Sequence, residues 1–204
     1  MSRVPRFLLA IYLIEAAILA IDPVDRTVWL AENLTAVLPV AGLVVLYFRK
    51  IRFSNTAYAV MTLFFLLHTV GGHYTFELVP LDDLFRALGA QRNHYDRICH
   101  FMVGGFAFGL CEFLETRGIV RGRPWVIVLA VMSIFGFAAI FELIEWIYAV
   151  LADPAAGNAF LGSQGDIWDA QKDMLCDGLG AIVFSALYCL IRPAKNADGN
   201  AAAR

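Results

Sequence analysis

Residues 162–180 read GSQGDIWDAQKDMLCDGLG, and this stretch decides the fold. A glycine-rich polar approach ends near Asp169, and an apolar segment follows that runs to about Ile191. Asp169, Asp173 and Asp177 are four residues apart, so they share one face of the helix that this segment predicts. Three carboxylates on a helix that enters a membrane repel one another and resist desolvation. The stretch therefore predicts that other parts of the chain supply positive charge at this depth.

Composition indicates an integral membrane protein. Of the 204 residues 60% are hydrophobic and 17% are charged, and the mean hydropathy is +0.67, which is too apolar for an ordinary soluble domain. The net charge of −2 gives no support for a nucleic-acid partner, which needs a basic face. We expect membrane lipid as a partner, no nucleic acid, and protein partners that the sequence leaves unknown. The four cysteines lie in apolar segments without a CxxC or CxxH pattern, which favours buried small hydrophobic residues.

Apolar runs close to the roughly 20 residues of a membrane-spanning helix recur along the chain. They predict an all-α integral membrane bundle of six transmembrane helices within residues 1–192, followed by a disordered tail at residues 193–204. The first run, preceded by two arginines, also resembles a signal peptide, but the later runs favour a retained span. A loop is expected at Thr75–His94. The expected spans are Phe7–Ile21, Asn33–Phe48, Ala57–Val70 with an extension to His73, Tyr95–Glu115, Pro124–Leu151 and Asp169–Ile191.

Basic residues in the loops predict the orientation. If both termini are cytoplasmic, the inside segments carry most of the 16 basic residues, as the positive-inside rule requires. These are Arg3, Arg6, Arg49, Lys50, Arg52, Arg117, Arg121, Arg123, Arg192, Lys195 and Arg204. Small residues in the fourth span, at Gly104, Gly105 and Gly109, are expected to let neighbouring helices approach closely.

This orientation brings imidazoles and carboxylates from several helices to one depth in the outer half of the bilayer. Asp96 and His100 are four residues apart, and Glu142 and Glu145 are three apart, which are the spacings that helical bundles use to converge ligands. A charge at membrane depth costs about 2.5–3.5 kcal/mol or more, so such residues are usually functional. The set suits a divalent cation such as Zn, Mn or Mg. The predicted metal ligands are His73, Asp96, His100, Asp169, Asp173 and Asp177.

Structural explanations stay open for the same residues. His68 is most simply a satisfied core histidine, and Glu145 and Asp169 lie near enough to the surface to be solvated. Glu142 and Glu145 could form interhelical ion pairs with Arg97. No HExxH or other strict metal motif is present, so a hydrogen-bond network without a metal is the alternative to a metal or proton site.

Three motifs together resemble the YjdF-like family of bacterial inner-membrane proteins of unknown function. They are YDRICHF at residues 95–101, FELIEW at residues 141–146 and LGSQGDIWDAQKDM at residues 161–174. The resemblance covers most of the chain and implies a multi-pass protein of the bacterial inner membrane, without implying a reaction. More faintly, the order of these acidic and histidine motifs is similar to the VanZ-like family, which is associated with tolerance of glycopeptide antibiotics. Glu145 and Asp177 depart from that second pattern.

The preferred functional hypothesis is a metal-dependent hydrolase or transferase that acts near the outer leaflet on a lipid or lipid-linked envelope substrate. Glu142 or Glu145 is the expected catalytic base, which would activate a water molecule at the metal. Arg97 and Lys172 are the expected contacts to an anionic head group. The alternatives are a proton- or cation-coupled transporter and a non-catalytic envelope or assembly factor. A transporter needs polar residues that continue to the inner face, where only Glu112 and Glu115 are found.

Overall fold

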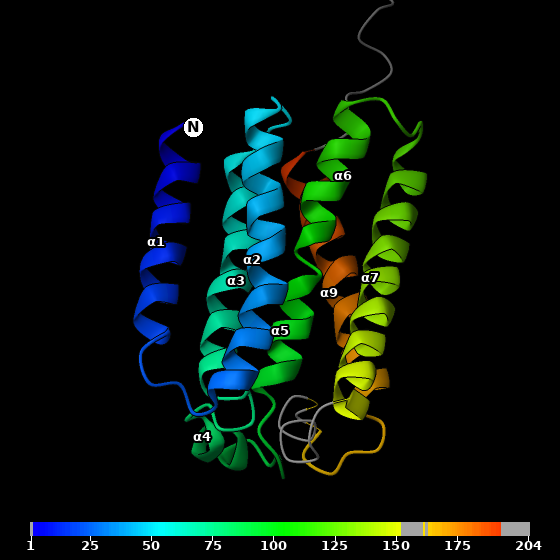
Figure 1. Cartoon of the computed structure of the whole chain (residues 1–204). Coiled ribbons are helices and arrows are strands. Elements are labelled where there is room, and N and C mark those ends of the chain that lie inside the picture. Colours follow the sequence, from blue (N-terminus) through cyan, green and yellow to red (C-terminus); the bar gives the residue numbers. More distant parts are fainter. Residues whose placement is uncertain (1, 152–160, 162, 193–204) are drawn as a thin grey trace, which may run out of the picture.

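Long helices run side by side between two ends of the molecule, with a short helix, α4, across one of them (Figure 1). The computed structural model of the chain describes residues 2–151, 161 and 163–192, and the predicted tail at residues 193–204 lies outside the described residues. We call the end where α4 lies the α4 end. The helices are α1 (Arg3–Leu19), α2 (Arg26–Phe48), α3 (Asn55–His73), α4 (Asp82–Ala87), α5 (Tyr95–Val103), α6 (Phe106–Thr116), α7 (Arg123–Leu151) and α9 (Asp169–Ile191).

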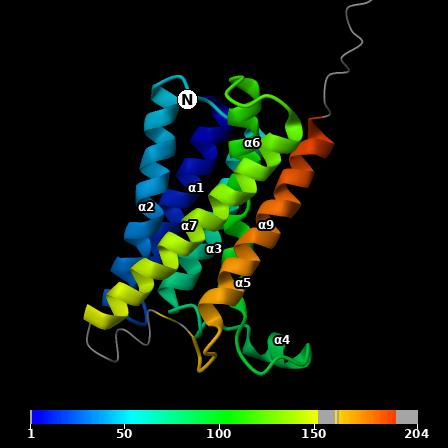
Figure 2. The ribbon, with the colours of Figure 1, turned by 90° about the vertical axis from the view of Figure 1, so that its right-hand side faces the viewer.

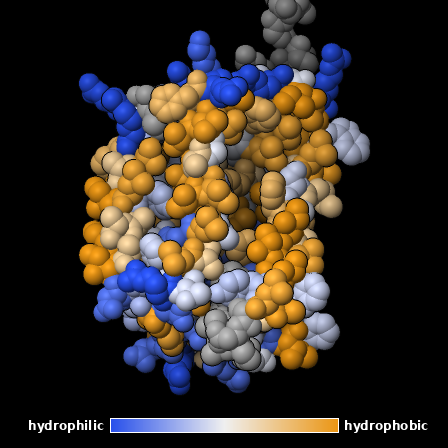
Figure 3. Space-filling model, in the orientation of Figure 1, coloured by the Kyte–Doolittle hydropathy of each residue, from blue (hydrophilic) through white to orange (hydrophobic). Residues whose placement is uncertain are grey.

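Four helical segments are long and apolar enough to cross a membrane: α2, α5 and α6 taken together as Tyr95–Thr116, α7 and α9. The 17-residue α1 and the 19-residue α3 run alongside them (Figure 1). Hydrophobic side chains cover much of the middle of the molecule, and hydrophilic ones gather toward both ends (Figure 3). The prediction of an all-α fold with membrane-length helices is confirmed.

Two predicted boundaries are corrected. The second helix begins at Arg26 and not near Asn33, because the carboxylate of Asp25 caps it by accepting hydrogen bonds from the backbone N–H groups of Thr27 and Val28 at 2.7 and 3.0 Å. The expected loop at Thr75–His94 contains α4, which buries Phe85 in a small apolar cluster with residues of the loop and of α5. The earlier start of α2 matters for the site, since it places Glu32 inside a helix.

The core lies where α3, α6, α7 and α9 meet, with α1 packed on the outer side of α3. Aromatic rings fill it, including Phe65 of α3 and Phe108 of α6, which packs edge-on against Tyr188 of α9 at a centroid distance of 5.4 Å. All four cysteines are free; Cys99 and Cys111 are buried, as their interpretation as small core residues requires, and Cys176 and Cys189 are half-buried. Seen from the side, α7 and α9 run obliquely past one another, and α9 starts at the α4 end (Figure 2). The α4 end is therefore where α5 begins, α7 ends and α9 begins.

Candidate metal centre

The fourth predicted span is broken at Gly104 and Gly105, where α5 ends and α6 begins. Hydrogen bonds of the tight i to i+3 kind replace the helical pattern there, from the N–H of Ala107 to the carbonyl of Gly104 at 2.9 Å and from Phe108 to Gly105 at 3.1 Å. At this break the chain touches α9 backbone against backbone. A Cβ atom on Gly104 would collide with the main chain of residues 180 and 181, and one on Gly180 would collide with the carbonyl oxygen of Phe101. The predicted close approach at Gly104 is thus present, with α9 as the partner.

The contact between Gly104 and Gly180 fixes the positions of the site residues. These lie one and two helical turns from the contact, on α5 and on α9. Because α5 and α9 both begin at the α4 end, residues that precede Gly104 lie beside residues that precede Gly180. His100 thereby meets Asp177, and the next turn brings Asp96 and Arg97 of α5 to the level of Asp173. The sequence spacing and the glycine contact together produce the convergence.

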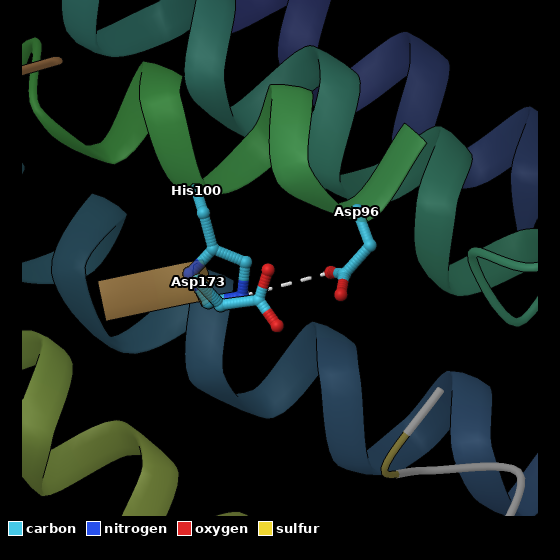
Figure 4. Close-up of side chains that lie close together, drawn as sticks. All are labelled: Asp96, His100 and Asp173. Carbon is cyan, nitrogen blue, oxygen red and sulfur yellow. Dashed lines mark ion pairs between the residues drawn. The ribbon is translucent and has the colours of Figure 1, made fainter. Parts of the chain in front are cut away.

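Among the described residues, Asp96, His100 and Asp173 form a group of side chains that could hold a metal ion (Figure 4). Each offers one ligand atom, and the three atoms lie within 4.8 Å of one another. The Nε2 atom of His100 is 3.6 Å from the Oδ1 atom of Asp96. His100 and Asp173 are buried, with 8% and 3% of their surface exposed, and Asp96 is half-buried. Two carboxylates and one imidazole at this spacing are a donor set that fits Zn or Mn.

Asp177 fixes the orientation of the histidine. The Nδ1 atom of His100 donates a hydrogen bond to the Oδ2 atom of Asp177 at 3.0 Å, and Asp177 is 1% exposed. A histidine that donates through Nδ1 presents Nε2 as the lone-pair nitrogen, which here faces Asp96. Metal-ligating histidines are held in this way by a carboxylate behind the ring. The arrangement therefore favours Asp177 as the residue that positions His100 over its role as a direct ligand.

Several buried oxygens at this level lack a hydrogen-bond partner among the described residues. They are Oδ1 of Asp173, Oδ1 of Asp177 and Oε1 of Glu142. The Nε atom of Arg97 is 3.7 Å from the Oδ1 atom of Asp173, which is beyond hydrogen-bond range. Buried polar atoms in folded proteins are nearly always satisfied, by protein groups, water or ions. These oxygens are consistent with a cation bound beside the three-residue group.

A network of ion pairs closes the α4 end outside this group. Asp169 accepts from Arg92 at 2.5 Å and from Arg97 at 2.9 Å, and Asp166 pairs with Arg97 at 2.7 Å and with Lys172 at 2.6 Å. Of the three aspartates Asp169, Asp173 and Asp177 on α9, the first therefore has the positive charge nearby that the sequence predicted. Asp169 is engaged by two guanidinium groups, while Asp173 lies deeper, and the two predicted ligands have different surroundings.

The pKa values of two groups outside the membrane-length helices, Asp166 and His94, are lowered within this network. Hydrogen bonds from Lys172 and Arg97 hold the pKa of Asp166 well below its usual range, so this carboxyl is ionised at neutral pH. Burial, followed by the nearby charges of Arg97 and Arg92, lowers the pKa of His94. The neutral ring accepts a hydrogen bond at Nδ1 from Arg97 at 3.1 Å. The charges of the segment before α5 are thus complementary to those of the segment before α9.

The predicted bases lie on α7 beside the group. Glu142 interacts electrostatically with Asp96, His100 and Asp173, and Glu145 interacts with Glu142, Asp96 and His100. The suggested ion pairs of these glutamates with Arg97 are not found among the described residues, since that guanidinium pairs with Asp166, Asp169 and Asp173 instead.

Glu32 of α2 was missed by the sequence analysis. It is 2% exposed, its Oε2 atom is 3.4 Å from Nε2 of His68, and it interacts electrostatically with Asp96 and His100. The sequence has Glu32 beside Asn33 within a mainly apolar segment, but the predicted helix began after the glutamate. His68 also lies 3.1 Å from the carbonyl oxygen of Glu32, so it is the satisfied core histidine that the sequence suggested.

His73 lies apart from the three-residue group. Its Nδ1 atom donates to the carbonyl oxygen of Leu19 at 2.8 Å, where α1 ends, and its ring packs against Tyr74. His73 lies at the predicted end of the bundle. Its depth in the membrane, however, does not determine which neighbouring helix the side chain faces. Its assignment as a ligand stays a prediction.

Comparison with known proteins places the chain in a family. The model of a family described as a predicted membrane protein (DUF2238) matches residues 4–194. The chain belongs to this family. Inner membrane protein YjdF of Escherichia coli (strain K12) is 37% identical over 160 residues, which are 78% of this chain and 76% of that protein. No solved structure matches the chain.

In this DUF2238 protein the matched range contains both the three-residue group and the ion-pair network around Asp166 and Asp169. The predicted YjdF-like resemblance is confirmed, and so is the predicted membrane location, since the family description and the candidate spans agree. The fainter VanZ-like resemblance stays a prediction.

Proposed function

We propose that this inner-membrane protein is a divalent-metal-dependent hydrolase or transferase that acts on a lipid or lipid-linked envelope substrate. One observation carries the proposal: the ligand atoms of Asp96, His100 and Asp173 lie within 4.8 Å of one another on two helices that are long and apolar enough to span a membrane. Three protein ligands leave open coordination positions, as catalytic metal sites do. A bound divalent cation would act there as a Lewis acid toward a carbonyl or phosphoryl oxygen.

The surrounding side chains support defined roles. Asp177 positions the imidazole of His100 through its 3.0 Å hydrogen bond. Glu142 is the preferred general base, because it interacts with His100, Asp173 and Asp96 and has a buried oxygen without a hydrogen-bond partner in the described chain. Glu145 lies one turn further along α7 and is the alternative base. Arg97 and Lys172, at the rim of the group, are the proposed contacts to the head group of the substrate.

The proposed topology has six spans, α1, α2, α3, α5 with α6, α7 and α9, with both termini cytoplasmic. The bias of basic residues toward the end opposite α4 supports it, and so do α1 and α3, which run alongside the candidate spans (Figure 1). Reporter fusions test it directly: a fusion after Gly89 is expected to report outside, and fusions after Arg52 and Arg121 inside. An outside signal at Arg121 would reverse the orientation.

A transporter is less well supported than an enzyme. In the described chain the layers between His100 and the opposite end are apolar and tightly packed, with Ala107, Phe108 and Cys111 fully buried. At that far end Glu115 pairs with Arg123, and Oε1 of Glu112 accepts a hydrogen bond from the backbone N–H of Ser54 at 2.7 Å. A site that lies near one end of the bundle fits chemistry on a substrate held in one leaflet.

The activity test uses purified protein in bacterial lipid nanodiscs, stripped with EDTA and then given Zn, Mn or Mg, with the lipids followed by mass spectrometry. The parent is expected to convert a lipid species only when metal is present. His100→Ala should be slower by at least about tenfold, because second-sphere changes alone cost that much. Asp83→Asn, an exposed aspartate on α4 at the same end, is the matched control and should keep the parent rate. A metal-loaded parent that converts no lipid would overturn the enzyme proposal.

A further inference from the structure

A groove lies between α1 and α2 in the half of the bundle opposite α4 (Figure 1). Both helices pack on α3 but have little contact with one another, so α3 forms the floor of the groove. The empty space, counted with the part that is open to the outside, is about 410 Å³. In a membrane an apolar chain fills such a space, because an empty groove would lose the packing contacts of its lining. The mainly apolar lining includes Pro5, Leu9 and Tyr12 of α1, Val40 and Val44 of α2, and Thr62 of α3.

Two arginines lie at the mouth of this groove, where α1 begins and α2 ends. The backbone N–H of Ser2 donates a hydrogen bond to the hydroxyl oxygen of Tyr47 at 2.5 Å, which joins the two helices there. The guanidinium group of Arg52 lies over the ring of Tyr47, 4.8 Å from its centroid. That ring is 6.4 Å from the ring of Tyr58, which lines the groove. Arg6, in the first turn of α1, donates through Nε to the carbonyl oxygen of Ser2 at 3.3 Å.

The positive charge at this mouth has no counterion within the described chain. Among the described residues, the guanidinium group of Arg52 makes no hydrogen bond or ion pair beyond its contact with the tyrosine ring. Exposed side chains in the adjoining parts of the described chain make none either: Arg3, Arg49 and Lys50. Of the carboxylates described at this end, Glu115 pairs with Arg123 and Glu112 lies 3.9 Å from Arg192. The mouth of the groove therefore attracts an anion from outside the chain.

Tyr12 adds a polar contact deeper in the groove. It is 3% exposed, and its hydroxyl group has no hydrogen-bond partner among the described residues. Buried hydroxyl groups are nearly always hydrogen-bonded, so this one is suited to an acceptor that enters the groove. Tyr12 is seven residues beyond Pro5 along α1, which places it about 10 Å further into the membrane. Cations at the mouth, a hydroxyl below them and apolar walls follow the order of phosphate, ester carbonyl and acyl chain in a phospholipid.

We infer that this groove binds one acyl chain of an anionic phospholipid, whose phosphate lies against Arg6 and Arg52. On the proposed topology the lipid belongs to the cytoplasmic leaflet, where basic residues next to helix ends attract anionic lipids. A second copy of the chain fits this face less well, because a twofold contact through it would bring the uncompensated cations of both copies together. The inference is independent of the proposed function, since the groove and the candidate metal centre lie in opposite halves of the bundle.

The test measures lipid binding to the full chain in detergent by native mass spectrometry. Dioleoyl phosphatidylglycerol is compared with dioleoyl phosphatidylcholine, which has the same acyl chains and no net charge, and the anionic lipid should bind about tenfold more tightly. Arg52→Gln should weaken binding of phosphatidylglycerol about fivefold, because each basic residue near a head group contributes about this factor, and should leave phosphatidylcholine unaffected. Arg121→Gln, an exposed arginine between α6 and α7, makes the same change of net charge and should bind as the parent does.

Two further variants test the groove itself. Val44→Phe fills the space between α1 and α2 and should weaken binding of both lipids by a similar factor, because it excludes the acyl chain. Tyr12→Phe should weaken binding about threefold through the loss of one hydrogen bond. Thermal unfolding shows which variants are folded, and if Val44→Phe is not, Tyr12→Phe alone reports on the groove.

Three results would overturn the inference. Equal binding of the two lipids by the parent would show that the cations do not select the head group. A loss in Arg121→Gln as large as that in Arg52→Gln would assign the attraction to the whole basic face. Parental binding in the folded groove variants would place the lipid elsewhere, and if Val44→Phe then also converts a dimer to a monomer, the groove is an interface between two copies of the chain.

Discussion

Two carboxylates at opposite ends of the bundle, Glu115 and Asp173, have different surroundings. At the end opposite α4, Glu115 has both oxygens engaged by Arg123, in two hydrogen bonds of 2.9 Å, and also accepts one from the hydroxyl of Tyr188. At the α4 end, arginines satisfy Asp169, but Asp173 keeps a buried oxygen without a hydrogen-bond donor in the described chain. The first pattern is that of a structural ion pair, and the second is that of a ligand set.

The same contrast is found within one helix. Asp169 and Asp173 are one turn apart on α9 and are both buried, with side chains 8% and 5% exposed. Asp169 accepts hydrogen bonds from two guanidinium groups, whereas Asp173 lies 3.7 Å from the Nε atom of Arg97, which also pairs with Asp166 and Asp169. From the four-residue spacing alone, the two aspartates would be expected to have the same surroundings. Their tertiary contacts give them different ones.

The largest expected effect follows from that contrast. Asp169→Asn leaves Arg92 and Arg97 short of a buried partner and should lower the free energy of unfolding by about 3–5 kcal/mol. Asp173→Asn removes a poorly compensated carboxylate and should cost far less when no metal is present. Chemical denaturation of both variants in detergent with EDTA measures the difference. Equal losses would show that Asp173 is also held mainly by ion pairing.

The helix crossing that builds the site gives the next largest effect. Gly180→Ala puts a Cβ atom against the carbonyl oxygen of Phe101 and should destabilise the protein by about 1–3 kcal/mol, because the backbones must move apart. It should also weaken metal binding, since the crossing sets the position of His100. Gly42→Ala is the matched control: no atom lies within 4 Å of the added Cβ, and helix propensity favours alanine by up to about 1 kcal/mol. Thermal unfolding and metal titration are the readouts, and an unaffected Gly180→Ala protein would remove the crossing from the account.

The smallest effect is expected at the opposite end. Glu115→Gln breaks the pair with Arg123, whose side chains are 31% and 19% exposed, and partly exposed pairs contribute roughly 0–1 kcal/mol. Metal content should stay at the parent level. A loss of metal in this variant would mean that the two ends are coupled, contrary to the comparison above.

The sequence predicted the site to the extent that periodicity determines it. Asp96 and His100 share a face of α5 by spacing, and the glycines nearby indicated a close helix contact. The sequence predicted a loop around Arg92. Its partner Asp169 lies 77 residues further along the chain, so no local sequence pattern predicts this ion pair. Glu32 was missed because the capping by Asp25 was not recognised, and His73 was included because depth says nothing of the direction in which a side chain points.

The most direct measurement of the central claim is the metal content of protein purified without chelator and supplied with Zn or Mn. The account predicts about one divalent ion per chain in the parent and in Asp83→Asn, and much less in His100→Ala and Asp173→Asn. Both depleted variants should still insert into the membrane, because neither change makes its helix more costly to bury. A parent that carries no stoichiometric divalent metal under these conditions would contradict the claim.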